Sequence, residues 1–319
     1  MTWQPTAPLT HIVARARLNR LIRDFFERRD VMEVETPLLC SSTATDPYLS
    51  SWKAQANGKM HYLQTSPEFC MKRLLAAGCG PIYQLGKAFR QEESSRQHNP
   101  EFTMLEWYRP DWTLDRLTDE VEALVLNAAS AFGKTLQPFA RLSYQQAFEA
   151  SLSLNPHSCS HQDLLNVANA RINGDFAMLD RDGLLDLLSS HLVEPTLPAT
   201  GCFLNEFPAS KASLAKTSLN QDGLAVAQRI ELYIAGKEIA NGYQELVDAA
   251  EQAERFTADQ SYRAQHGLPP LPTPSHLISA LQNGFPESAG VALGVDRLLM
   301  VLLDCDNIGD VISFPTHTA

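Results

Sequence analysis

The chain lacks the segments that export or membrane insertion requires. None of its apolar stretches approaches the ~18–20 residues that a membrane span needs. Residues 1–9 contain no basic stretch followed by an apolar run, so no secretion signal is expected. The six cysteines form no C-x-x-C pair and no zinc-finger spacing with histidine. We therefore expect reduced thiols, no structural zinc site and a cytoplasmic location.

Positive charge is also scarce. The chain has 26 Lys and Arg against 37 Asp and Glu, a formal net charge of −11. This balance disfavours general binding to nucleic acid or to an anionic membrane, which needs a cationic surface. Hydrophobic residues make up 44% of the 319 positions, enough for a sizeable core. No strong domain boundary is visible in the sequence.

The hydrophobic pattern predicts helices and strands in mixed order. Helical spacing is found at 10–30 (with Thr10 as the N-cap), 67–77, 114–131, 181–191, 256–266 and 295–303. A short strand is expected at 31–36, and two hairpins pair 82–92 with 102–109 and 225–234 with 238–246. This order favours an α+β fold with a mainly antiparallel sheet flanked by helices, not a doubly wound parallel sheet.

Polar side chains share one face of the first predicted hairpin. Because side chains alternate along a strand, the even positions group together: Arg90, Glu92, Glu106 and Tyr108. Gly86 and Ala88 lie on the same face, and small residues within a strand indicate the close approach of another group. The alternative is the solvated outer face of an antiparallel sheet.

The second hairpin has the same character. Asn241, Tyr243 and Glu245 share a face, and Glu231 and Glu238 lie on either side of the turn. Neighbouring carboxylates repel unless a cation lies between them, and oxygen ligands of this kind suit Mg²⁺ held with substrate phosphates. Alone, the pair is better explained as two exposed glutamates at the rim.

A third segment, 290–297, begins with small residues at alternate positions and ends in Arg297. Small residues allow a planar ligand to lie against a strand, and an arginine at a helix start can bind phosphate. Close packing of a helix on a strand also uses small residues, so this segment gains weight only beside the other two.

Three motifs in this order resemble the catalytic core of class II aminoacyl-tRNA synthetases of the lysine branch. Val34-Glu35-Thr36-Pro37 resembles the first motif, which lies at the dimer interface in that family. Phe89-Arg90-Gln91-Glu92, followed by His98 and Phe102, resembles the second, and 294–297 the end of the third. The resemblance covers the chain from about residue 11 onward. It implies a single catalytic domain over 1–319, a homodimer, and the use of ATP and Mg²⁺.

The resemblance also implies a role for individual residues. Arg90 would contact the ATP α-phosphate and the substrate carboxylate, which suits a planar cation. Further ATP contacts would come from Glu92, His98, Asn99, Phe102, Glu231, Leu232, Gly294 and Arg297. Glu231 and Glu238 would hold the metal, and the catalytic set would be Arg90, Arg297, Glu231 and Glu238.

The implied substrate carries two ammonium groups. Glu68, which follows Ser66 and Pro67, would bind the amino group near the substrate carboxylate. Glu106 and Glu245, with Tyr108, would bind the distal ammonium. The remaining substrate contacts would be Arg90, Glu238, Asn241, Tyr243 and Ala292. A buried ammonium is costly unless paired, so these carboxylates favour a lysine-like substrate over an apolar one.

Two departures from the lysyl-tRNA synthetase pattern refine this prediction. Complete bacterial enzymes carry an anticodon-binding domain before the core, and no such N-terminal domain is expected here, nor stable tRNA binding. The third motif normally reads G-x-G-x-G, whereas this chain has Ala292. The added methyl would crowd an α-amino group more than an amino group one carbon further along. Both departures resemble the truncated paralogues that ligate (R)-β-lysine to a lysine of elongation factor P.

The sequence therefore predicts ATP-dependent activation of (R)-β-lysine and its transfer to the ε-amino group of a lysine on elongation factor P. One alternative is a truncated lysyl-tRNA synthetase that uses α-lysine for tRNA or another acceptor. An asparagine synthetase of related fold suits the three carboxylates less well. A non-catalytic regulatory paralogue is disfavoured because the expected ATP-binding side chains are present.

Overall fold

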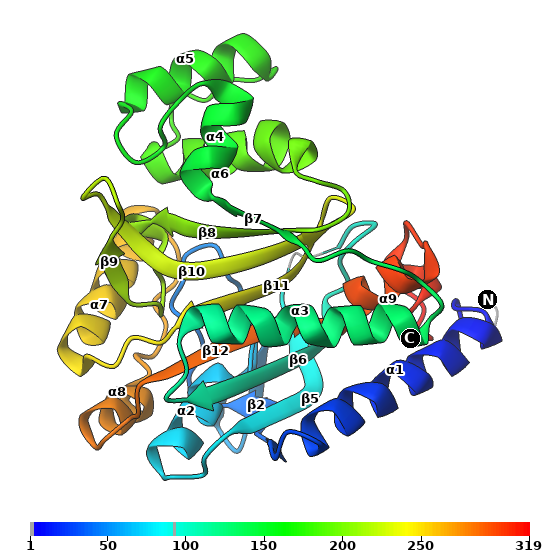
Figure 1. The fold of residues 1–319 in the computed structure, drawn as a ribbon. Helices are drawn as coiled ribbons and strands as arrows, with labels where there is room; N and C mark the ends of the chain where they lie inside the picture. The colour runs from blue at the N-terminus through cyan, green and yellow to red at the C-terminus, as the bar shows by residue number, and fades with distance from the viewer. Residues whose placement is uncertain (1–2, 92–93) are drawn as a thin grey trace. The chain divides into compact units, whose positions relative to one another are not determined.

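The computed structural model describes residues 3–91 and 94–319, and the chain divides into two compact units. The first unit comprises residues 1–135 and 245–319, and the second comprises residues 136–244. Each contains helices packed on mainly antiparallel strands, which confirms the α+β class (Figure 1). The single catalytic domain over 1–319 stays a prediction.

In the first unit the central strands follow the order β1-β5-β6-β12. Their bounds are β1 (Met32–Glu33), β5 (Ile82–Phe89), β6 (Glu101–Pro110) and β12 (Ser288–Gly294). β1 runs parallel to β5, and the other pairs are antiparallel. A smaller sheet contains β2 (Leu39–Cys40), β4 (Lys59–Leu63) and β3 (Lys53–Ala56). The pairing of β5 with β6 confirms the first predicted hairpin, whereas β1 is much shorter than the predicted 31–36.

The register of three strands gathers polar and small side chains on one face. Glu106 on β6 lies opposite Gln84 on β5 and opposite Ala292 on β12. Tyr108, two residues further along the same strand, lies opposite Gly290. Because residues two apart project to the same side of a strand, all five share a face. The predicted grouping by even positions is therefore correct for Glu106 and Tyr108, whereas Arg90 lies beyond the end of β5.

Six α-helices belong to the described part of the first unit: α1 (Leu9–Glu27), α2 (Glu68–Ala76), α3 (Leu114–Ala131), α7 (Ala249–Gln265), α8 (Ser275–Gln282) and α9 (Val295–Leu303). α3 and α9 match their predicted ranges. α1 begins after Pro8, so the prediction that Thr10 caps it is wrong. α7 starts before the predicted 256 because the Asp248 side chain accepts hydrogen bonds from two backbone amides of its first turn.

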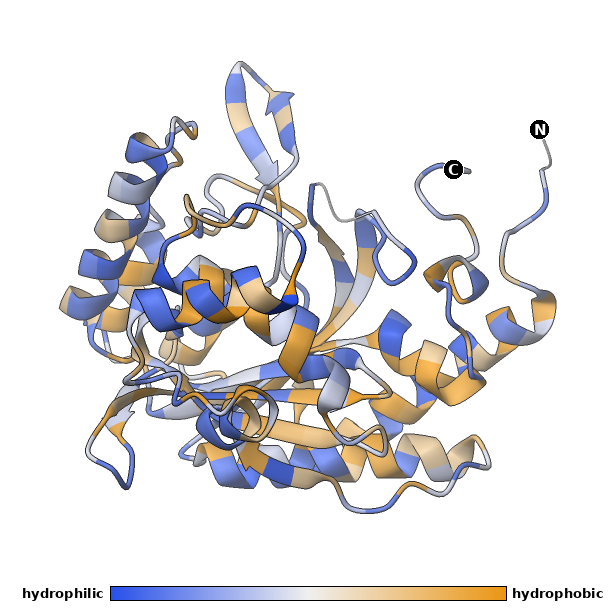
Figure 2. Cartoon of the chain, turned by 90° about the horizontal axis from the view of Figure 1, so that it is seen from above, coloured by the Kyte–Doolittle hydropathy of each residue, from blue (hydrophilic) through white to orange (hydrophobic). Residues whose placement is uncertain are grey.

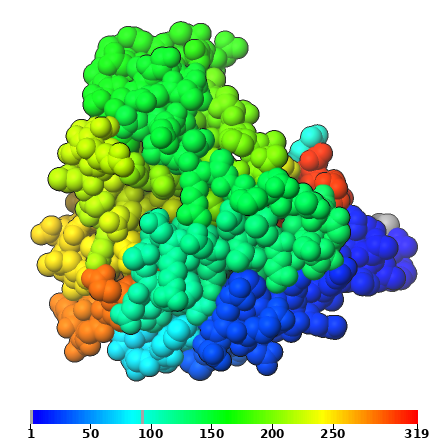
Figure 3. All heavy atoms as spheres, viewed as in Figure 1, coloured from blue at the N-terminus to red at the C-terminus, as the bar shows by residue number. Residues whose placement is uncertain are grey.

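The core of the first unit forms where α1, α3 and α9 contact one another and the strands. Phe25 and Phe26 on α1 are buried, and the Phe26 ring stacks on Tyr83 with 4.5 Å between ring centroids. Polar and apolar residues interleave along α1, as expected for a helix with one buried side (Figure 2). The space-filling view shows α3 at the surface next to α1 (Figure 3).

In the second unit the strands follow the order β11-β10-β8-β7, and β9 also pairs with β10. They are β7 (Ala140–Ser143), β8 (Cys202–Pro208), β9 (Thr217–Leu219), β10 (Ala225–Ile234) and β11 (Lys237–Gln244). The turn between β10 and β11 contains two residues, both with positive φ, Ala235 at 50° and Gly236 at 69°. Such a two-residue turn matches the twist of a hairpin, which confirms the second predicted hairpin with a shorter loop.

The described part of the second unit contains three α-helices, α4 (Tyr144–Leu152), α5 (His161–Arg171) and α6 (Arg181–Leu188). α4 packs on β7 and β8, and α5 packs on α6. A π-helical turn at Ser189–Val193 follows α6, so the predicted helix at 181–191 is broken before its end. Leu184, Leu188 and Phe148 are fully buried in this unit's own apolar cluster. Short 3₁₀ turns occur at Glu194–Thr196, Ala209–Lys211 and, in the first unit, Ile308–Asp310.

Two further expectations can be compared with the described residues. All six cysteines are unbridged, as predicted for reduced thiols. Among residues 3–91 and 94–319, no helix is both long enough and apolar enough to cross a membrane.

A buried ion pair supports the first unit, and its removal is a test of the packing. Arg109 and Trp107 on β6 both donate hydrogen bonds to Glu120 of α3, and all three side chains are buried. Replacing Glu120 with alanine leaves Arg109 charged and unpaired, so we expect a loss of about 3–5 kcal/mol in unfolding free energy by urea denaturation. Glu254→Ala, on the exposed side of α7, is the control and should leave the urea midpoint of unfolding unchanged. A loss below 1 kcal/mol for Glu120→Ala would show that this pair does not support the unit.

Candidate functional site

Three carboxylates and one lysine meet in the first unit, and we call this group the carboxylate cluster: Glu68, Lys72, Glu106 and Glu245. Glu68 and Lys72 lie on the first turns of α2, Glu106 lies in the middle of β6, and Glu245 follows β11. Glu106 and Glu245 are almost completely buried, with 2% and 1% of their surface exposed. The three glutamates are those that the sequence assigned to two ammonium groups.

Glu106 is held by two hydroxyl groups. Ser66 Oγ donates to Glu106 Oε2 at 2.7 Å, and Tyr108 Oη donates to Glu106 Oε1 at 2.6 Å. Ser66 Oγ also accepts a hydrogen bond from the backbone amide of Glu68 at 3.0 Å, which ties the start of α2 to the cluster. Burial, and then the charge of Glu68, raise the pKa of Glu106 to about 7.

Lys72 bridges the other two carboxylates. Its Nζ lies 2.7 Å from Glu68 Oε1 and 2.5 Å from Glu245 Oε2, and its side chain is buried. Burial alone would lower the pKa of Lys72, but the charges of Glu245 and Glu68 outweigh it and raise this pKa. Burial raises the pKa of Glu245, and the Lys72 ammonium opposes this shift. The sequence prediction missed this internal cation.

Small residues of β12 line the same face of the strands. A Cβ atom at Gly290 would lie 2.3 Å from a ring carbon of Tyr108 and 2.5 Å from Glu245 Oε1. Only glycine therefore allows these two side chains to approach β12 so closely. Ala292 lies opposite Glu106 and is half-buried. Gln84, on the other side of Glu106, has a buried Oε1 that accepts no hydrogen bond from the described residues.

The residues predicted to bind phosphate also lie in the first unit. Arg90 follows β5, and its guanidinium carbon lies 5.2 Å from the centre of the Phe102 ring. Arg297, in the first turn of α9, contacts the Nε2 atom of His98, and Ser95 Oγ lies 2.7 Å from the Nδ1 atom of the same ring. The structure thus brings His98 and Arg297 together.

Three further residues were predicted to contact ATP. Gly294 is the N-cap of α9. The Asn99 side chain donates to the Glu101 carbonyl at 2.5 Å and accepts from the Thr316 amide at 3.1 Å, so its amide group is engaged by backbone. Glu92 lies outside the described residues.

Asp296 is a second residue that the sequence prediction missed. Its Oδ2 accepts a hydrogen bond from the Thr103 amide at 2.7 Å, and its Oδ1 pairs with Arg15 of α1. These contacts fix the first turn of α9, and therefore Arg297, against β6 and α1.

In the second unit, β10 and β11 bring the predicted metal ligands to one face. Glu231 lies opposite Asn241, and Tyr233 lies opposite Glu238. Because residues two apart share a side, Glu231 and Glu238 project to the same face of the hairpin. Tyr243 lies opposite Arg229, and Leu232 is buried with its side chain on the other face.

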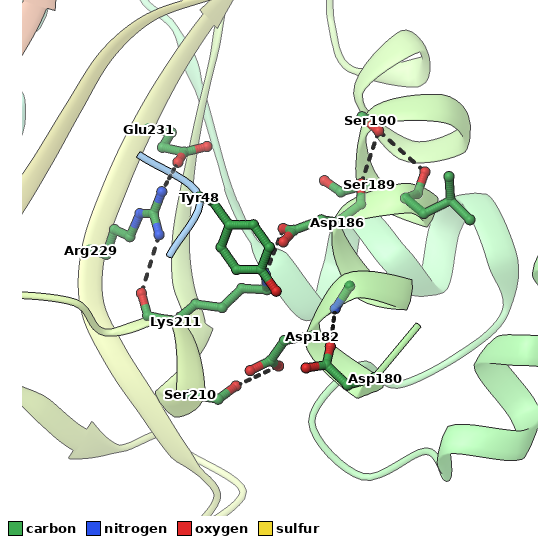
Figure 4. A network of polar contacts seen from close by, with 12 residues as sticks. Tyr48, Asp180, Asp182, Asp186, Ser189, Ser190, Ser210, Lys211, Arg229 and Glu231 are labelled. Atoms are coloured by element: carbon green, nitrogen blue, oxygen red, sulfur yellow. Dashed lines mark hydrogen bonds and ion pairs between the residues drawn. The ribbon is translucent and has the colours of Figure 1, made fainter. Parts of the chain in front are cut away.

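Figure 4 shows the Arg229 guanidinium between Glu231 and the backbone carbonyl of Lys211. Arg229 pairs with Glu231 Oε1, and Tyr233 Oη donates to Oε2 at 2.7 Å. Burial raises the pKa of Glu231, and the charge of Glu238 adds to this shift while Arg229 opposes it. Burial and the charge of Glu231 raise the pKa of Glu194 to about 7. A divalent cation would relieve this repulsion, but the described residues contain no group of three or more His, Cys, Asp or Glu arranged to hold a metal, so a Mg²⁺ ion here would need further ligands such as substrate phosphates.

The family model for class II tRNA synthetases (D, K and N) matches residues 6–318. The chain belongs to this family. Among relatives of this class II synthetase, the elongation factor P (R)-β-lysine ligase of Edwardsiella ictaluri (strain 93-146) is 46% identical over 334 residues. The alignment covers 100% of this chain and 98% of the relative. The ligases of the same name from Yersinia pestis (strain Pestoides F) and Yersinia pseudotuberculosis (serotype O:1b, strain IP 31758) are also 46% identical, with the same coverage.

The raised pKa of Glu106 in this class II synthetase predicts how stability depends on pH. In the folded state Glu106 keeps its proton up to about pH 7, whereas the unfolded side chain loses it near 4.5. Between these values the folded state binds more protons, so the free energy of unfolding falls as pH rises. Between pH 5 and pH 8 the free energy of unfolding should fall by about 2–3 kcal/mol less in Glu106→Gln than in the wild type. Urea denaturation at a series of pH values measures this difference.

Only the slope of the unfolding free energy against pH is diagnostic. The hydrogen bonds that Glu106→Gln loses change this free energy by the same amount at every pH. Glu254→Gln, at an exposed position of α7, should keep the wild-type slope. An unchanged slope in Glu106→Gln would contradict a raised pKa at this carboxyl group.

Proposed function

We propose that this protein is an ATP-dependent ligase that activates (R)-β-lysine as an acyl-adenylate and joins it to the ε-amino group of a lysine on elongation factor P. The carboxylate cluster carries the proposal on the structural side. The names of relatives that align with the whole chain at 46% identity support the same substrate and acceptor.

The charge of the cluster fits a diamino acid. Glu68, Glu106 and Glu245 supply three carboxylates, and Lys72 supplies one ammonium. When all are ionised, two negative charges remain in a buried group. An uncompensated buried charge costs several kcal/mol, and two ligand ammonium groups would remove that cost. An apolar or acidic amino acid would leave it in place. Gln84 Oε1 offers one more acceptor beside Glu106.

Ala292 is our proposed determinant of the isomer. It lies opposite Glu106 on the face that also carries Tyr108. Its methyl group would take space against the bound amino acid. An amino group on the β-carbon lies one bond further along the chain, so the methyl group crowds it less than an α-amino group.

We assign the activation step to the first unit's cationic residues. Bound ATP would supply the adenylyl group that activates the substrate carboxylate. Arg90 would orient that carboxylate against the α-phosphate and stabilise the negative charge that develops there. Phe102, whose half-buried ring lies beside Arg90, would stack on the base, and His98 with Arg297 would bind the outer phosphates. In the second unit, Glu231 and Glu238 would hold Mg²⁺, with Asn241 and Tyr243 as substrate contacts.

The second step transfers the acyl group to the acceptor. The lysine ε-amine attacks the carbonyl carbon, the bond from that carbon to the phosphate oxygen breaks, and AMP leaves as the nitrogen loses a proton. No described residue is needed as a base, because holding amine and adenylate together supplies most of the acceleration.

We also propose a cytoplasmic homodimer that does not bind tRNA stably. Several apolar side chains of the first unit are exposed: Leu9, Val13, Met32, Leu38, Leu39 and Met60. Exposed apolar surface of this kind is typical of an interface, here with a second copy, since Leu38 and Leu39 follow the first-motif proline. Six unbridged cysteines support a reducing compartment, and a net charge of −11 disfavours tRNA.

The proposal is tested by ATP–pyrophosphate exchange with (R)-β-lysine, α-lysine and aspartate in turn, followed by mass spectrometry of elongation factor P after incubation with ATP and the preferred amino acid. We expect the highest kcat/KM for (R)-β-lysine, and a mass gain of one β-lysyl group on a lysine of the acceptor. Arg90→Ala should abolish both. Exchange with aspartate alone would contradict the proposal, and no exchange with any of the three would favour a regulatory paralogue.

Ala292→Gly tests the isomer assignment. Removing the methyl group should shift the ratio of kcat/KM for (R)-β-lysine over α-lysine toward α-lysine by about tenfold, the usual effect of one methylene in a binding site. Ala289→Gly, on the opposite side of β12 and buried, is the matched control and should leave the ratio unchanged. An unchanged ratio in Ala292→Gly would contradict the assignment.

A further inference from the structure

Lys72 has surroundings unlike those of the other lysines described in the first unit. The residue is 1% exposed, and its ammonium contacts two carboxylates from different parts of the chain, Glu68 one helical turn before it and Glu245 after β11. Lys53, Lys59 and Lys87, by contrast, are exposed or partly exposed. A lysine is rarely buried unless its charge is paired, and the ammonium of Lys72 forms ion pairs with two carboxylates.

The ammonium of Lys72 has three N–H donors, of which one donates to Glu68 Oε1, and its charge forms an ion pair with Glu245 Oε2. The other titratable groups that face it are Glu106 and Tyr108 on β6. Glu106 receives its hydrogen bonds from hydroxyl groups instead, so it has no internal cation as a direct partner. The three carboxylates are therefore not equivalent, because two share a cation and one does not.

We propose that Lys72 is a positioning residue for the amino-acid substrate: its ammonium holds Glu68 and Glu245 in place and leaves the carboxylate cluster with two negative charges, matched to a ligand with two ammonium groups. This inference rests on the proposed function for the identity of the ligand. Lys72 makes no contact with a reacting atom in this scheme. It acts through the two carboxylates, by fixing their positions and by favouring the charged form of Glu245.

Without the ammonium, three buried carboxylates would face one another with no internal cation. Each like charge makes ionisation of its neighbours harder, so the cluster would keep protons to higher pH. A ligand ammonium then has to displace those protons, and its affinity falls tenfold for each pH unit below the carboxyl pKa. Loss of Lys72 should therefore appear as a shift in pH dependence.

The decisive variant is Lys72→Met, which keeps the length of the side chain and removes its charge. Lys53→Met, on β3 at an exposed position, is the matched control. We expect the pH below which KM for (R)-β-lysine rises to move upward by about one unit in Lys72→Met, with KM at pH 7 raised about tenfold and partly restored at pH 9. The kcat at saturating substrate should change less than about threefold. A loss of activity that is equal at every pH would overturn the proposal, because a merely structural role gives that result.

A second readout needs no substrate. Carbon-13 NMR of protein labelled at the glutamate carboxyl carbons, assigned through single Glu→Gln variants, follows each carboxyl group with pH. The midpoint of Glu245 should rise in Lys72→Met and stay in place in Lys53→Met. An unchanged midpoint in Lys72→Met would overturn the proposal. Failure of the proposed function would be seen separately, as wild-type enzyme that exchanges with no lysine isomer, while this titration still decides the role of Lys72.

If Lys72→Met does not fold, the double variant Lys72→Met/Glu68→Gln removes one charge of each sign and relieves the repulsion. Its Glu245 carboxyl midpoint is then compared with that of Glu68→Gln alone, which retains the Lys72 ammonium. A higher midpoint in the double variant supports the proposal, and an equal midpoint overturns it.

Discussion

Like charges that are buried together must be balanced, and this constraint governs the first unit's functional group. Glu106 and Glu245 are almost fully removed from solvent, and Glu68 lies beside them. Three ionised carboxylates in such surroundings would be too costly without cations or hydrogen-bond donors. The chain supplies one ammonium and two hydroxyl groups. The remaining negative charge is what a doubly cationic amino acid would neutralise, and the substrate preference follows from this electrostatic balance.

The fold holds these groups in place through regular elements, not flexible loops. β6 provides Glu106 and Tyr108 at a spacing of two, and the register with β12 places Gly290 and Ala292 opposite them. The first turn of α2 contributes Glu68, and its backbone amide is fixed by Ser66. Sites built on strands and helices keep their geometry to within a fraction of an ångström, which oriented binding requires.

Much of this arrangement could be predicted because it depends on local periodicity. Alternation along a strand placed Glu106 and Tyr108 on one face. The predicted turn of the second hairpin placed Glu231 near Glu238. Lys72 could not be found in this way, since a lysine on a short amphipathic helix is usually exposed. Its spacing of four from Glu68 was a usable signal, but the contact with Glu245 depends on tertiary packing. Asp296 was missed for the same reason, because Arg15 and Thr103 come from distant segments. The N-cap of α1 and the short β1 show that element ends are decided by packing and local competition.

The central claim is that the cluster recognises two ammonium groups, and calorimetric titration tests it most directly. (R)-β-lysine is compared with 6-aminohexanoate, which lacks the amino group near the carboxylate, and with 3-aminohexanoate, which lacks the distal one. The account predicts that each analogue binds about a hundredfold or more weakly than the diamine, because each leaves a buried carboxylate unpaired. An analogue with one amino group that binds as tightly as (R)-β-lysine would contradict it.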